Sequence, residues 1–248
     1  MMESKSKYCK NCESNTQGKY CAECGQKTTI GKVTFKETIQ DLFDAIFSIE
    51  APLIATLKML ALNPGKLFKE YLAGKRKKYY KPVTFFILMT VIYLVIRGII
   101  KFDPFGSNLM QVDDPSSSQL LAKAREFFLV NINKLLFAFV FSLGLILKLF
   151  FYKKYTLAEF LAVSFYLMAV YTLLTTLNMF YIRFIDASFQ AWHIIIMVLY
   201  FTYAMISFFE GNKILVTVKS LFAFVLAFYL YGFLGFAFSF LIVWLRYL

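Results

Sequence analysis

Hydrophobic residues gather in long runs in the part of the chain that follows residue 81. A membrane-spanning helix needs about 20 mostly apolar residues, because the hydrocarbon core of a bilayer is about 30 Å thick. The runs predict five such helices, at about 82–100, 130–151, 157–181, 191–209 and 219–245. The predicted fold class is therefore an all-α membrane protein with a transmembrane bundle over residues 82–248.

Residues 31–81 carry an amphipathic pattern instead. Thr34 and Glu37 have capping-box spacing at the start of a first helix, Pro52 can start a second, and Asn63-Pro64-Gly65 separates it from a third. Each stretch is too short or too amphipathic to cross a bilayer. We expect a collar that lies flat at the membrane interface or caps the bundle, because periodicity shows an apolar face without showing its partner.

A basic cluster ends this collar directly before the first apolar run. It consists of Lys75, Arg76, Lys77, Lys78 and Lys81. Such a cluster is typical of contact with anionic lipid headgroups, at about 1 kcal/mol for each Lys or Arg. With the N-terminus in the cytoplasm, most of the 27 Lys and Arg residues fall on the cytoplasmic side, and five spans put the C-terminus outside. Topology thus explains the net charge of +12, and we expect no nucleic-acid partner.

The composition supports a membrane protein. Hydrophobic residues make up 59% of the chain and its mean hydropathy is +0.61, whereas soluble domains are roughly 45–50% apolar. Residues 1–30 contain no apolar run that resembles a secretory signal, so we expect them to stay in the cytoplasm, where thiols remain reduced.

All four cysteines lie in that first segment, as two Cys-x-x-Cys pairs: Cys9, Cys12, Cys21 and Cys24. Four thiolates complete the tetrahedral coordination that structural Zn²⁺ prefers and leave no position open for water. A segment of this length cannot build a core of its own, so a metal would hold it together. We predict a four-cysteine zinc-ribbon head over residues 1–30 with structural Zn²⁺; a redox pair or disulfides are the alternatives.

One polar helical face lies inside the predicted third span and consists of Ser164, Tyr171, Thr175 and Asn178. This face could line a pathway or pocket for a polar solute, but hydrogen bonds between helices are the commoner use of such residues. His193, beside Trp192, is expected at the membrane interface.

Several stretches together resemble a family of bacterial membrane proteins. They are a four-cysteine segment that ends Cys-x-x-Cys-Gly-Gln-Lys, then "VTFKETIQDLF", then "NPGKLFKEYLAGKRKKYYKPVTFF". This family is an uncharacterised domain of unknown function with an N-terminal zinc ribbon. The resemblance implies an integral protein of the bacterial inner membrane and a zinc site at the four cysteines, and it implies no activity. The stretch "TLAEFLAVSFYLMAVY" is similar, in architecture only, to the five-span Yip family.

The sequence contains no His-Glu-x-x-His, Gly-x-Ser-x-Gly, P-loop or Rossmann glycine pattern. We therefore expect a protein that is not an enzyme. The favoured hypothesis is a membrane adaptor or scaffold whose cytoplasmic head recruits a protein partner and whose collar contacts anionic lipids. The alternative hypothesis is a small-solute transporter or channel that uses the polar face of the third span.

Overall fold

The computed structural model describes residues 8, 14–15, 18–23, 51–76, 78–102, 119–132, 135–185 and 192–247. The chain divides into two compact units, residues 1–49 and residues 50–248. In the described part of the first unit, Tyr8 and Asn15 form an isolated antiparallel bridge. In the described part of the second unit all regular elements are α-helices, which confirms the predicted all-helical class.

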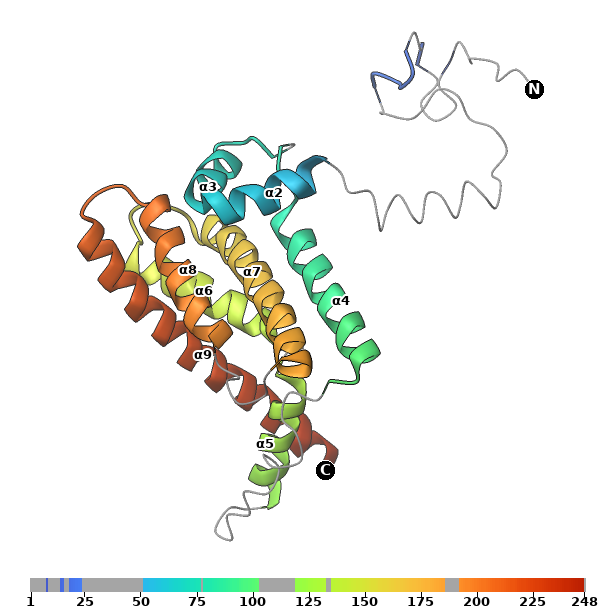
Figure 1. The fold of residues 1–248 in the computed structure, drawn as a ribbon, viewed down its shortest axis with the longest axis vertical. Coiled ribbons are helices and arrows are strands. Elements are labelled where there is room, and N and C mark those ends of the chain that lie inside the picture. Colours follow the sequence, from blue (N-terminus) through green and yellow to red (C-terminus); the bar gives the residue numbers. More distant parts are fainter. Residues whose placement is uncertain are drawn as a thin grey trace. The chain divides into compact units, whose positions relative to one another are not determined.

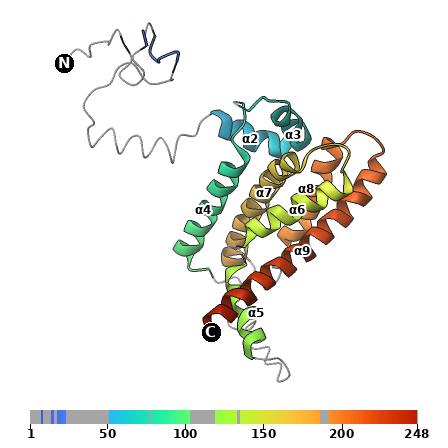
Figure 2. The ribbon, with the colours of Figure 1, turned by 180° about the vertical axis from the view of Figure 1, so that it is seen from behind.

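The second unit contains a bundle with a helix pair across one end (Figures 1 and 2). The helices are α2 (Ala51–Leu62), α3 (Pro64–Leu72), α4 (Pro82–Ile100), α5 (Gln119–Asn131), α6 (Leu136–Phe150), α7 (Leu157–Phe184), α8 (Trp192–Phe208) and α9 (Lys213–Tyr247). Helices α4 and α6 to α9 run alongside one another, α2 and α3 lie at one end, and α5 lies at the other.

Helix α7 is the centre of the packing, since it contacts α4, α6 and α8. Helix α9 packs on α5, α6 and α8, and α3 packs on α8. The core consists largely of aromatic and aliphatic side chains from α4, α6, α7 and α8, among them Phe86, Phe139, Leu143, Leu167 and Phe201. Other large apolar residues, such as Val95, Leu199 and Phe222, point outward and remain exposed. An apolar outer surface of this kind suits a hydrocarbon surrounding.

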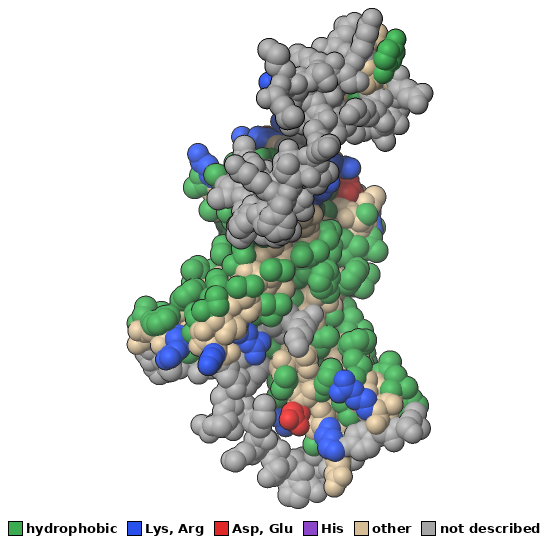
Figure 3. All heavy atoms as spheres, turned by 90° about the vertical axis from the view of Figure 1, so that its right-hand side faces the viewer, with side chains coloured by type: hydrophobic (Ala, Val, Ile, Leu, Met, Phe, Trp, Pro, Cys, Tyr) green, Lys and Arg blue, Asp and Glu red, His purple; other side chains and the backbone are tan. Residues whose placement is uncertain are grey.

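Among the described residues, three helices are long and apolar enough to cross a membrane: α4, α7 and α9. A fourth span results if α5 and α6, whose axes meet at 88°, are taken together. Helix α8 is apolar but has only 17 residues. Hydrophobic side chains dominate the middle of the face in Figure 3, and Lys and Arg appear above and below them. The protein is therefore a membrane protein with three to four candidate spans among the described residues.

The element bounds agree with some of the predicted spans and differ from others. Helix α4 covers 82–100 as predicted, and α7 starts at the predicted residue. The predicted span 130–151 is instead divided between the end of α5 and the whole of α6. Helix α9 begins at Lys213, almost two turns before the predicted residue 219, because Asn212 caps it by accepting hydrogen bonds from the amides of Ile214 and Leu215.

Candidate functional site

The helix pair at one end of the bundle is held in shape by two small polar side chains. We call residues 51–76 and 78–81 the cap. The buried Thr56 hydroxyl donates to the Pro52 carbonyl (2.7 Å) and accepts from the Tyr80 amide (2.8 Å), which joins α2 to the segment that leads into α4. The Asn63 side chain accepts from the Lys66 amide (3.0 Å) and caps α3, and Pro64 occupies the first position of that helix.

Close backbone contact attaches the cap to α8. The Gly65 amide donates to the Ser207 hydroxyl at 2.9 Å, and a Cβ atom at position 65 would lie 2.2 Å from the Ser207 carbonyl carbon. Two tyrosines of α8 add further hydrogen bonds: Tyr200 donates to the Leu60 carbonyl (3.0 Å) and Tyr203 to the Leu62 carbonyl (2.7 Å). The last carbonyls of a helix have no partner within it, so these hydroxyls complete the end of α2.

An aromatic cluster continues this contact into the bundle. Tyr166 of α7 donates to the Tyr80 carbonyl, and its ring lies 6.1 Å from the rings of both Phe68 and Phe85. The Phe68 ring also meets Phe208 edge-on at 5.5 Å. Phe68, Phe85, Tyr166 and Phe208 are at most 1% exposed. The described cap therefore packs on the end of the bundle, and residues 31–50 of the predicted collar lie outside the described part.

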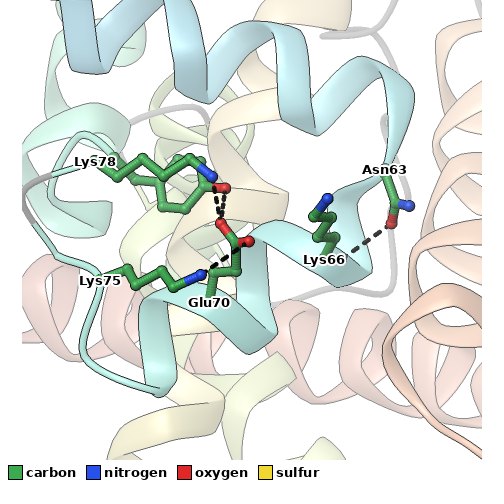
Figure 4. A network of polar contacts seen from close by, with 6 residues as sticks. Asn63, Lys66, Glu70, Lys75 and Lys78 are labelled. Atoms are coloured by element: carbon green, nitrogen blue, oxygen red, sulfur yellow. Dashed lines mark hydrogen bonds and ion pairs between the residues drawn. The ribbon is translucent and has the colours of Figure 1, made fainter.

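Glu70 organises the basic cluster on the outer side of the cap (Figure 4). Its carboxylate accepts from Lys78 (2.6 Å), Tyr79 (2.6 Å) and Lys75 (3.3 Å), and its side chain is 15% exposed. The hydrogen bond from Lys78, followed by that from Tyr79, lowers the pKa of Glu70 to about 2, although partial burial opposes the shift. Burial first, and the hydrogen bond to Glu70 second, raise the pKa of Tyr79. Glu70 thus offsets part of the local positive charge.

The five basic residues predicted to contact lipid headgroups therefore differ in their surroundings. Lys75 and Lys78 form ion pairs with Glu70, and Arg76 lies 6.0 Å from the centre of the Tyr71 ring. Lys81 is exposed, and Lys77 lies outside the described residues. A separate ion pair joins Lys69 of α3 to Glu210 at 2.7 Å, just after α8, and lowers the pKa of Glu210.

A cavity of about 200 Å³ lies inside the bundle, further along α7 from the cap. Its walls come from α4, α6, α7, α8 and α9 and from residues next to them. The aromatic part of the lining is Tyr93, Phe102, Phe139, Tyr171, Phe228 and Tyr231. The other polar side chains are Thr175, Asn178 and His193, and none of the described lining residues is Asp, Glu, Lys or Arg.

The predicted polar face of the third span is largely brought together in this cavity. Tyr171, Thr175 and Asn178 line it, whereas Ser164 is fully buried elsewhere on α7 and its hydroxyl has no hydrogen-bond partner. The Thr175 hydroxyl donates to the Tyr171 carbonyl (2.9 Å), so this hydrogen bond stays within α7. Three of the four predicted residues therefore share one site.

Sequence reasoning missed the partners that other helices supply. Tyr93 of α4 and Tyr231 of α9 complete the polar lining, and His193 lies there with its ring 6.1 Å from that of Tyr171. Because these residues are far apart along the chain, no local sequence pattern indicates that they share a cavity. A missed signal that was local is the Thr156–Glu159 capping box, which fixes the start of α7.

The predicted zinc ligands lie mostly outside the described part of the chain. Cys9, Cys12 and Cys24 belong to the undescribed residues, while Cys21 is buried with its sulfur 3.0 Å from the Ser14 hydroxyl oxygen. Among the described residues alone, no group of three or more His, Cys, Asp or Glu side chains could hold a metal ion. The zinc site stays a prediction.

Comparison with known proteins gives one family. A family model described as a protein of unknown function (DUF3667) matches residues 50–94, which comprise the cap and the first two thirds of α4. No curated protein and no solved structure matches the chain. The match supports a likeness to an uncharacterised family, and it falls on the segment that carries the contacts between cap and bundle.

Proposed function

We propose that this protein is a non-enzymatic membrane adaptor or scaffold whose N-terminal head recruits a protein partner. The observation that carries the proposal is the attachment of the cap, which contacts α7 and α8 through buried rings and hydrogen bonds. The head precedes the cap in the chain, so a partner bound to the head would be tethered to a fixed platform. The match to the family model falls on this same segment.

The proposal includes an orientation in a bacterial inner membrane. The α6–α7 turn lies at the cap end, since Tyr155 stacks on Phe208 at 4.8 Å. Five lysines lie near the helix ends on that side: Lys148 in the last turn of α6, Lys153 and Lys154 between α6 and α7, and Lys213 and Lys219 in the first two turns of α9. The positive-inside rule then places the cap in the cytoplasm. In the proposed five-span form, α6 and α8 also cross the membrane. These helices are only about 22 and 26 Å long, so the bilayer thins around them.

The proposal also includes a structural zinc ion on Cys9, Cys12, Cys21 and Cys24. The burial of Cys21 supports a folded head, because a segment of about 30 residues needs a metal or disulfides to bury side chains. Elemental analysis of the purified protein should give one zinc per chain, and Cys21→Ser/Cys24→Ser should remove it. Four disulfide-bonded or freely titratable thiols without metal would contradict the ribbon.

Affinity purification after cross-linking in cells tests the adaptor function. Wild type, a deletion of residues 1–30, and the matched bundle variant Thr175→Leu/Asn178→Leu should all insert in the membrane. We expect the deletion to lose a specific set of partners and the bundle variant to keep them. A deletion variant that retains every partner would refute recruitment by the head.

The cavity favours a second candidate, a small-solute transporter. Tyr171, Thr175 and Asn178 give it polar walls in the second half of α7, inside the bundle that a transported solute would cross. Solute flux into proteoliposomes that is lost in Thr175→Leu/Asn178→Leu would support this function. No flux across a broad panel of solutes would count against it.

A further inference from the structure

We propose that the bundle cavity binds a small uncharged aromatic molecule that carries an O–H or N–H donor, of the indole or phenol class. This binding site is additional to the adaptor function and does not depend on it. Four observations on the cavity support the proposal: its volume, its aromatic walls, its lack of formal charge, and the hydrogen bonds that its hydroxyl groups already make.

The volume and the walls suit a single ring system. A cavity of about 150 Å³ lined by Leu, Ile and Phe is large enough to bind benzene, so about 200 Å³ accommodates one substituted or bicyclic ring. Phe139 and Tyr231 stack in parallel with their ring centres 5.0 Å apart, and Phe228 lies 6.1 Å from Phe139. Aromatic walls favour an aromatic guest, because rings attract one another in stacked and edge-on arrangements.

The polar lining selects against a charged guest. None of the described lining residues is Asp, Glu, Lys or Arg, and only His193 among them can become cationic near neutral pH. A charged molecule would lose its hydration on entering such a site without gaining an ion pair in return. An uncharged molecule does not meet this penalty.

The hydroxyl groups determine which hydrogen-bonding group the guest needs. The Thr175 hydroxyl donates its proton to the Tyr171 carbonyl (2.9 Å), and the Tyr231 hydroxyl donates its proton to the Ile132 carbonyl (2.7 Å). A hydroxyl has one proton and two acceptor lone pairs. The oxygens of these two cavity-lining residues therefore keep acceptor capacity, and a guest with an O–H or N–H group can pair with them.

The test compares indole with indene, which has the same shape and lacks the N–H group. Binding is measured by equilibrium dialysis against the full-length protein in lipid nanodiscs, and empty nanodiscs correct for partition into lipid. We expect saturable binding of one indole per chain, and binding of indene that is roughly tenfold weaker because an acceptor stays unpaired. Equal affinities, or no saturable binding of indole, would overturn the proposal.

Variants locate the site. Thr175→Val/Tyr231→Phe keeps the shape and removes both acceptors, so it should bind indene as wild type does and lose most of the preference for indole. Thr202→Val is the matched control, because the Thr202 hydroxyl also bonds within its own helix, to the Val198 carbonyl (2.8 Å), and does not line the cavity. An unchanged preference in Thr175→Val/Tyr231→Phe would overturn the assignment, and so would tighter binding of indole-3-carboxylate than of indole.

The same assay separates this inference from the proposed functions. Cys21→Ser/Cys24→Ser should bind indole as wild type does, even where it loses its partners. Indole binding in nanodiscs needs no transport, so an absence of flux in proteoliposomes would leave the inference intact.

Discussion

Helices α3 and α8 approach each other so closely at Gly65 that no side chain fits between them. The variant Gly65→Ala therefore tests the contact that attaches the cap to α8. A Cβ atom there would lie 2.2, 2.3 and 2.4 Å from the Ser207 carbonyl carbon, the Ser207 oxygen and the Phe208 nitrogen. These are backbone atoms, which cannot rotate away. Helix α3 must move by more than about 1 Å to restore the usual 3.5–4.0 Å spacing of nonbonded carbon atoms.

The expected destabilisation combines three contributions. Overpacking a well-packed contact costs about 1–3 kcal/mol, and loss of the Gly65–Ser207 hydrogen bond costs roughly 1 kcal/mol more. The higher helix propensity of Ala offsets about 1 kcal/mol. Leu67 and Phe68, which are 0% and 1% exposed, must move with α3, so we expect a net loss of about 2–3 kcal/mol.

The free energy of unfolding is measured in mixed detergent–SDS micelles, with far-ultraviolet circular dichroism as the signal. Ser207→Ala adds no clash and removes the hydrogen bond from Gly65, together with the one that the Ser207 hydroxyl donates to the Ala204 carbonyl, and should cost about 1 kcal/mol. Gly232→Ala is the control, because a Cβ atom there meets nothing within 4 Å and Ala favours the helix by up to about 1 kcal/mol. If Gly65→Ala unfolds at the same SDS fraction as Gly232→Ala, the close contact between α3 and α8 does not exist.

Further expectations concern charge, hydrogen bonding and orientation. Because the pKa of Glu70 is lowered to about 2, its ion pairs stabilise the fold at pH values above the unfolded pKa near 4.5 and lose this effect as the pH falls toward about 2. The difference in unfolding free energy between wild type and Glu70→Gln should therefore shrink over that pH range. A difference that stays constant would contradict the reasoning. Tyr203→Phe removes one hydrogen bond to a carbonyl of α2 and should cost about 1 kcal/mol in SDS unfolding, and no loss would mean that water replaces it. In intact cells a membrane-impermeant maleimide should label Lys101→Cys and spare Lys154→Cys, and the opposite result would invert the proposed orientation.

Sequence patterns predicted the helices best where an apolar run ends in strong boundary signals. Pro82 opens α4, and α4 has the predicted bounds. The bend between α5 and α6 was not predicted, because the predicted span 130–151 included the polar residues Asn131, Asn133 and Lys134 at its start. The early start of α9 was missed because Lys213 and Lys219 suggested a boundary, although Asn212 supplied the cap.

The inner faces of the helices could not be predicted from periodicity. Helices α7 and α9 carry apolar residues on every side, so no single apolar stripe distinguishes the side that faces the core from the side that faces lipid. The cavity shows the consequence, since Tyr171, Thr175 and Asn178 were found as one face while Tyr93 and Tyr231 come from distant segments. The contact between the cap and α8 could not be predicted either, because the role of Gly65 depends on where α8 lies.

Helix α7 joins the two sites, which raises the question of whether they affect each other. Tyr166 contacts the cap and Thr175 lines the cavity, and nine residues of helix separate them by about 13–14 Å. Effects of substitutions more than 7–10 Å apart without shared partners usually add to within about 0.5 kcal/mol. We therefore expect Gly65→Ala and Thr175→Val to be additive in SDS unfolding. A larger coupling energy in the double variant would mean that α7 shifts as a unit, and that occupancy of the cavity is felt at the cap.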